Sequence, residues 1–155
     1  LIEFGRPVFT PGRPVREAAI ALMQRIHRDF QYAPKSTSIE TPLEEVMTAR
    51  RGVCQDFAHV MIGTLRAWGL AARYVSGYLR SDQELQGAQA SHAWVSVYAP
   101  GAGWIDLDPT NNILPSGGHI TLAWGRDFGD VTPVRGVTMG GGQHKVDVEV
   151  RVLPA

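Results

Sequence analysis

Cys54 is the only cysteine in the 155-residue sequence, and its surroundings favour a chemical role. The segment RGVCQDF at 51–57 predicts that a helix begins at this residue. The first backbone N–H groups of a helix have no intrahelical partner, and together with the positive end of the helix dipole they stabilise an anion. A cysteine placed there is held in its reactive thiolate form. We therefore expect Cys54 to be a nucleophile, with a buried inert cysteine as the common alternative.

The helix that carries Cys54 is predicted from apolar residues at helical spacing. These residues are Phe57, Met61, Leu65 and Trp68, and Gly69 follows them as a C-terminal stop. The helix would bury this face and present its N-terminus to a cleft. Arg50 and Arg51, just before the thiol, are expected to be solvated, with attraction of an anionic substrate group as the alternative.

A predicted β-hairpin brings a histidine and an aspartate together. Residues 92–98 form one strand pattern, 100–103 a turn, and 104–108 the antiparallel return. The start of the first strand then lies opposite the end of the second, so His92 and Asp108 are expected neighbours. Asp106 stays open as an alternative carboxylate, because strand alternation places it on the same face as Asp108.

A thiol, a histidine and a carboxylate are the components of nucleophilic acyl transfer. In this interpretation Cys54 attacks a carbonyl carbon, His92 takes the thiol proton and later protonates the leaving amine, and Asp108 orients the imidazole. The backbone N–H of Cys54 is the expected oxyanion donor, and the sequence identifies no second one. His59, five residues beyond Cys54, is a weaker base candidate because it lies around the helix from the thiol.

The rest of the chain supplies scaffold. Residues 15–30 predict an amphipathic helix that starts at Pro14, and 70–79 and 145–152 predict strands. Thr41 and Glu44 predict a capping box around Pro42 at the start of a short helix. Residues 1–13 are expected to be extended or irregular, and 119–137 to mix a short apolar stretch with turns.

Composition excludes several classes of protein. The length is that of one domain, and 15 basic residues balance 15 acidic ones, so we expect no nucleic-acid partner. No apolar run approaches the ~20 residues that span a bilayer, so no membrane partner is expected. A single cysteine fits a reducing compartment, which predicts a cytoplasmic protein. No spacing typical of zinc or calcium ligands occurs, and we expect neither a metal nor another cofactor.

Three segments resemble, in order, the motif blocks of the transglutaminase-like superfamily: RGVCQDFA at 51–58, HAW at 92–94 and GWIDLDPT at 103–110. The similarity covers about Pro14 to Gly136 and is greatest to the bacterial transglutaminase-like cysteine proteases. It implies a papain-like α+β fold in which the nucleophile helix packs on an antiparallel β-sheet. It also implies that the catalytic triad is Cys54, His92 and Asp108, which favours Asp108 over Asp106.

The resemblance further implies a cysteine-dependent hydrolase of peptide or amide bonds that works through a thioester, with a peptide or protein as substrate. Acyl transfer to an amine is the second interpretation, since it uses the same triad. A papain-like binding module without activity is the third. We expect residues 1–155 to form a single catalytic core domain that belongs to a longer chain.

Overall fold

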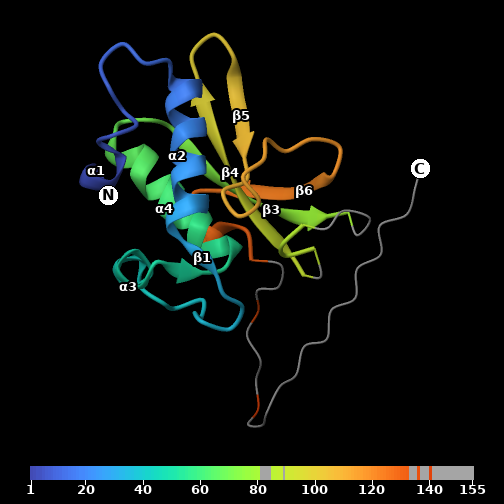
Figure 1. Ribbon diagram of the computed structural model, residues 1–155. Coiled ribbons are helices and arrows are strands. Elements are labelled where there is room, and N and C mark those ends of the chain that lie inside the picture. The colour runs from blue at the N-terminus through green and yellow to red at the C-terminus, as the bar shows by residue number, and fades with distance from the viewer. Residues whose placement is uncertain (81–84, 89, 133–135, 137–139, 141–155) are drawn as a thin grey trace.

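The computed structural model describes residues 1–80, 85–88, 90–132, 136 and 140. The elements follow in the order α1 (Ile2–Gly5), α2 (Val15–Asp29), β1 (Gln31–Tyr32), α3 (Leu43–Ala49), β2 (Arg51–Gly52), α4 (Cys54–Ala67), β3 (Ala72–Leu79), β4 (His92–Ala99), β5 (Gly103–Leu107), β6 (His119–Gly125) and the 3-10 helix η1 (Phe128–Asp130) (Figure 1). The helices precede the main sheet in the chain, so the α+β architecture expected from the sequence is confirmed.

The main sheet has four antiparallel strands in the order β5-β4-β3-β6. The predicted hairpin is its β4–β5 pair, in which Tyr98 lies opposite Trp104. The sequence indicated only a short apolar stretch where β6 forms. A bulge between Ser76 and Gly77 interrupts the β3–β6 pairing, and a Cβ at Gly77 would lie 2.0 Å from the Ile120 carbonyl oxygen. Glycine therefore permits the close approach of β6.

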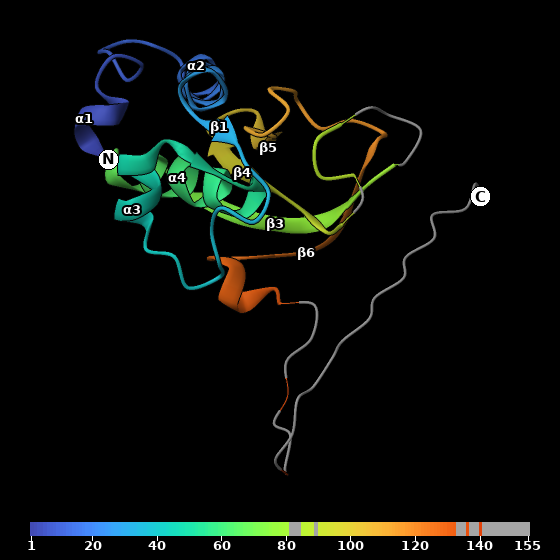
Figure 2. The same cartoon turned by 60° about the horizontal axis from the view of Figure 1, so that its bottom comes forward.

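Helix α4 packs against β4 and β3 and forms the centre of the core (Figures 1 and 2). Phe57, Met61 and Leu65 are buried, as their spacing predicted. The helix ends in a Schellman motif, since Gly69 has φ +78° and the N–H of Leu70 bonds to the carbonyl of Leu65. The C-terminal end of the nucleophile helix is thus fixed by local sequence.

Helix α2 packs against α4 and against β5 and β4. Its apolar residues recur at steps of three and four along the chain. Ala19, Leu22 and Ile26 among them lie in the core with no exposed surface. None of the helices in the described ranges combines the length and apolar character that a bilayer crossing requires.

Two local predictions were wrong. Residues 2–5 form a short helix because tertiary contacts order them: Phe4 meets the ring of Phe30 edge to face at 5.9 Å, and Trp68 Nε1 donates to the Ile2 carbonyl. The capping box at Thr41 does not form, because the Thr41 hydroxyl accepts from Ser38 N–H and the helix begins one residue after Pro42. The strand predicted at 145–152 lies outside the described residues.

Candidate active site

Cys54 is the first residue of α4, as predicted, and the residue is half-buried. The first helical hydrogen bond runs from Phe57 N–H to the Val53 carbonyl at 3.1 Å. The N–H groups of residues 54–56 precede that bond and have no acceptor within the helix. The chain before Cys54 is held by the parallel pairing of Tyr32 with Gly52. The thiol therefore lies beside backbone donors on a fixed segment.

Asp56 secures the start of this helix. One of its carboxylate oxygens, Oδ2, accepts the N–H of Val53 at 2.8 Å and the hydroxyl of Thr37 at 2.6 Å. A carboxylate in the first turn also interacts favourably with the helix dipole. Asp56 thus has a structural role, and it orients the turn that presents Cys54.

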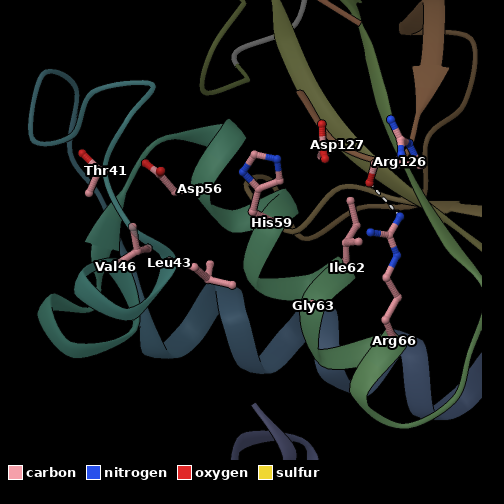
Figure 3. Close-up of a pocket in the computed structure, with 10 residues that line it drawn as sticks. All are labelled: Thr41, Leu43, Val46, Asp56, His59, Ile62, Gly63, Arg66, Arg126 and Asp127. Atoms are coloured by element: carbon pink, nitrogen blue, oxygen red, sulfur yellow. Dashed lines mark hydrogen bonds between the residues drawn. The ribbon is translucent and has the colours of Figure 1, made fainter. Parts of the chain in front are cut away.

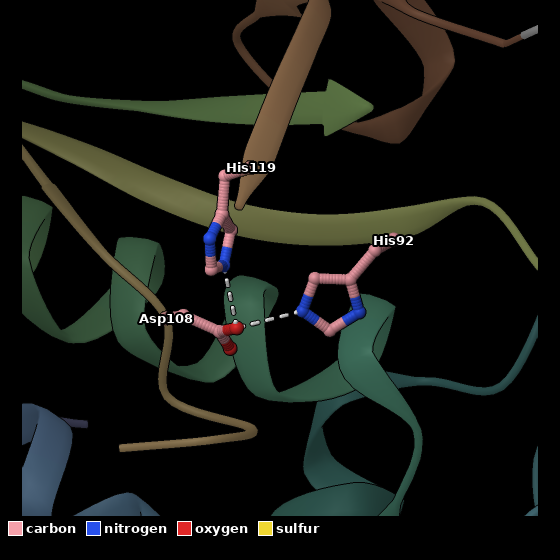
Figure 4. Close-up of side chains that lie close together, drawn as sticks. All are labelled: His92, Asp108 and His119. Atoms are coloured by element: carbon pink, nitrogen blue, oxygen red, sulfur yellow. Dashed lines mark hydrogen bonds and ion pairs between the residues drawn. The ribbon is translucent and has the colours of Figure 1, made fainter. Parts of the chain in front are cut away.

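His92 and Asp108 meet as the hairpin predicted. His92 is the first residue of β4 and Asp108 follows the last residue of β5, and His92 Nε2 lies 2.9 Å from Asp108 Oδ2 (Figure 4). Both side chains are completely buried. The alternative carboxylate, Asp106, instead lies 3.4 Å from the indole nitrogen of Trp94. Of the two aspartates, Asp108 is the one positioned to orient the imidazole.

The electrostatics of His92 link it to both neighbours. Burial alone would lower its pKa, but the hydrogen bond to Asp108 and the nearness of Cys54 outweigh burial and raise the pKa to about 9. Because Nε2 is engaged by Asp108, the nitrogen left for Cys54 is Nδ1, which is buried and has no hydrogen-bond partner among the described residues. The imidazole thus has one nitrogen bonded to the carboxylate and the other left for the thiol.

Asp108 is the centre of a hydrogen-bond network. Its Oδ1 accepts the backbone N–H of Thr110 and of Asn111, at 2.9 and 3.2 Å. Its Oδ2 accepts from the Asn111 amide at 2.9 Å, from His92, and from His119 Nε2 at 3.0 Å (Figure 4). Burial raises the pKa of this carboxyl, but the donors outweigh it and hold the pKa far below its usual range. Asp108 is therefore a carboxylate in the folded protein.

Sequence reasoning missed three members of this network. His119 arrives on β6, and Asn111 also bonds through its side-chain amide to the backbone of Gln86. His27, on α2, contacts the Thr110 carbonyl through Nδ1 at 3.0 Å. Asn111 could have been found from its place in the turn after Asp108, but no local pattern connects His119 or His27 to that turn.

His92, Asp108 and His119 also have the composition of a metal site, since one ligand atom from each lies within 4.8 Å of the others. The geometry around Oδ2 is that of hydrogen bonding, because three N–H donors already converge on it. A cation would have to displace protons from both imidazoles. That the protein needs no metal stays a prediction.

His59 lies away from this network, in a separate pocket of about 220 Å³ along the side of α4 (Figure 3). Its Nε2 accepts the backbone N–H of Phe128 at 3.3 Å, and burial lowers its pKa. Neither Cys54 nor His92 lines this pocket. Among the described residues, His59 therefore has the contacts of a structural histidine, in agreement with its low rank as a base.

Arg50 has a role that the sequence did not indicate. Its guanidinium lies over the rings of Phe4 and Phe30, at 4.9 and 4.8 Å from their centroids. It is also the left-handed C-cap of α3, with φ 52°. Arg50 is exposed, as expected, and these cation–π contacts hold its guanidinium over the two rings.

Comparisons with known proteins agree with this geometry. The profile of the transglutaminase-like superfamily matches residues 3–109. An uncharacterized protein of Mycobacterium tuberculosis is 45% identical over 162 residues, which cover 98% of this chain and 52% of that protein. The chain thus spans about half the length of the mycobacterial relatives that it matches.

Two further relatives carry names that indicate chemistry. A protein-glutamine gamma-glutamyltransferase of Pseudomonas aeruginosa is 34% identical over 104 residues, which cover 61% of this chain and 16% of that enzyme. The crystal structure of a candidate cysteine protease from Cytophaga hutchinsonii superposes with a TM-score of 0.73 and 32% identity, over 85% of this chain and 44% of that one. The papain-like α+β fold and its sequence motifs thus occur together, and the chain belongs to the transglutaminase-like superfamily.

Proposed function

We propose that this domain is a cysteine-dependent acyl-transfer enzyme that cleaves peptide or amide bonds through a thioester on Cys54. The observation that carries the proposal is the buried His92, held by Asp108 through Nε2 while its Nδ1 is left for the Cys54 thiol. Acid–base catalysis requires such a group within reach of the nucleophile, oriented by a third residue.

The reaction follows from these positions. His92 Nδ1 accepts the thiol proton, and the resulting thiolate attacks the substrate carbonyl carbon. The oxyanion that forms is stabilised by the N–H of Cys54 at the start of α4. Collapse of this intermediate breaks the C–N bond, and His92 returns the proton to the leaving amine. Asp108 remains a carboxylate throughout and balances the charge of the imidazolium.

The thioester then has two fates. If His92 deprotonates water, the acyl group leaves as an acid and the domain is a hydrolase. If an amine is deprotonated instead, a new amide forms and the domain is a transferase. The Cytophaga and Pseudomonas relatives are named for one fate each, and we propose hydrolysis because the Cytophaga protein matches more of this chain.

The proposal is tested with a reactive acyl donor. We expect p-nitrophenyl acetate to acetylate wild-type protein on Cys54, visible by intact mass and peptide mapping, and Cys54→Ala to acquire no such adduct. Adding a lysine-like diamine and measuring acetic acid against acetylated amine separates hydrolysis from transfer. Blocked peptides and peptide amides are then compared as substrates. Absence of a Cys54 adduct together with no release of p-nitrophenolate above that of Cys54→Ala would favour a binding module instead.

Gly87 offers a sharper test of the His92 Nδ1 environment. A Cβ at Gly87 would lie 2.7 Å from this nitrogen. We expect Gly87→Ala to slow acylation of Cys54 by about tenfold or more, because His92 must shift away from the thiol. Gly101→Ala is the matched control: φ is +82° there and +87° at Gly87, but its Cβ would meet nothing within 4 Å. Equal rates in the two variants would contradict this placement of Nδ1.

The cellular setting remains a prediction. A cytoplasmic location and a peptide or protein partner are expected from the single cysteine and from the proposed chemistry. The matched relatives are longer proteins that contain such a domain. The activity of a whole protein of that kind is part of the same proposal.

A further inference from the structure

His119 is a second histidine on the carboxylate that orients His92. It is the first residue of β6, its side chain is 3% exposed, and its Nε2 lies 3.0 Å from Asp108 Oδ2 (Figure 4). The reaction described above gives it no proton to move. A buried titratable group bonded to the centre of the site therefore needs a separate explanation.

The direction of its hydrogen bond follows from Asp108. Burial opposes ionisation of this carboxyl, but the hydrogen bonds from His119 and His92 outweigh it and keep the Asp108 pKa far below the usual range. A carboxylate only accepts hydrogen bonds, so both imidazoles must donate through Nε2–H. In a neutral His92 this leaves Nδ1 unprotonated and able to take the thiol proton.

Aromatic packing fixes the two rings relative to each other. Trp94 meets His119 edge to face, with centroids 5.1 Å apart and planes at 86°, and it stacks on His92 at 6.2 Å and 27°. His119 comes from β6, at the edge of the sheet opposite to β5, after which Asp108 follows. Its hydrogen bond therefore ties the far strand to the site.

We propose that His119 is a positioning residue, whose Nε2–H donates to Asp108 Oδ2 and thereby locks His92 with its Nδ1 toward Cys54. The inference deepens the proposed acyl transfer and rests on it for its effect on rate. Without this donor Oδ2 keeps two partners, His92 and the Asn111 amide, and the carboxylate can turn away from the orientation that His92 needs.

The test compares His119→Gln with His119→Met. Glutamine can place an N–H donor near the same oxygen, whereas methionine fills similar space without a donor. We expect His119→Met to lower kcat for acyl-donor turnover by about 10- to 100-fold with KM changed less than about twofold, and His119→Gln to restore most of that loss. Thermal unfolding midpoints are measured for both. Equal losses in the two variants, or an unaffected His119→Met, would overturn the proposal.

A second readout does not depend on turnover. Long-range ¹H–¹⁵N spectra of histidine-labelled protein report the tautomer of each ring. At a pH above about 9, where His92 is neutral, we expect both His92 and His119 to carry the proton on Nε2 in the wild type, and His92 to become a mixture of tautomers in His119→Met but not in His119→Gln. A wild-type His119 protonated only on Nδ1 would refute the positioning role. If these spectra are as expected but no acyl donor is turned over, the proposed function fails and the positioning role stands.

Discussion

Replacing His92 with glutamine is expected to slow alkylation of Cys54 by iodoacetamide at about pH 6 by roughly 10²-fold or more. Glutamine can still donate to Asp108, but it cannot hold the thiol proton. In the wild type the pKa of His92 is raised to about 9, so its imidazolium persists from pH 6 up to that value. Labelling of the wild type should therefore change little over this interval, whereas in His92→Gln it should rise steadily with pH.

The matched control is His59→Gln, the same substitution at a histidine of α4 outside the site. Glutamine can accept the Phe128 N–H that His59 accepts, so we expect the alkylation rate of this variant to stay within about twofold of the wild type. Intact mass at timed intervals gives both rates. Slow labelling of the wild type itself, unchanged in His92→Gln, would mean that the imidazole does not activate the thiol, and the enzymatic proposal would lose its support.

Replacing Asp108 with asparagine is expected to lower turnover by about 10³- to 10⁴-fold. All five hydrogen bonds to this carboxylate are accepted by its two oxygens. An asparagine has one oxygen and one NH₂ group. In either orientation its NH₂ group faces N–H groups that also donate, and these lose their acceptor. His92 then has to lose its hydrogen bond or change tautomer, and a changed tautomer would place the proton on the nitrogen that faces Cys54.

The same substitution should destabilise the fold, because buried donors are left unpaired, by about 1–3 kcal/mol in the free energy of unfolding. Asp106→Asn is the control, since Asp106 has one long contact, to Trp94 at 3.4 Å, and an amide oxygen can replace it. Steady-state turnover and urea unfolding of both variants decide the assignment. An active Asp108→Asn protein beside an inactive Asp106→Asn protein would reverse the roles of the two aspartates.

The contribution of His92 to the free energy of unfolding also depends on pH. The direction of this dependence follows from its raised pKa. The folded-state pKa of His92 is raised from 6.5 to about 9, so the protonated form binds its neighbours more favourably in the folded protein. This contribution is fully present below about pH 6.5 and is lost as the pH rises through about 9. The alkylation and turnover measurements are therefore best compared below about pH 9.

Local sequence was sufficient to predict the elements that carry the chemistry. The helix of Cys54 has apolar spacing and a terminal Gly69, and the β4–β5 hairpin has strand patterns joined by a glycine turn. Such signals depend on residues within one or two turns of each other, so they can be read without the rest of the fold. The pairing of His92 with Asp108 was accessible for the same reason.

Tertiary structure decided between alternatives that strand alternation and residue spacing in the sequence could not separate. Strand periodicity gives Asp106 and Asp108 the same face, and the structure separates them, since Asp108 is bonded to His92 and Asp106 lies at the Trp94 indole. Helix α1 forms where the sequence predicted irregular chain, because Phe4 packs against Phe30.

The convergence of His119 on Asp108 likewise depends on strand order, since it comes from the far edge of the sheet. The sequence therefore determined which residues could react. The fold determined which second histidine holds the carboxylate, because contacts between distant strands leave no periodic trace in the chain.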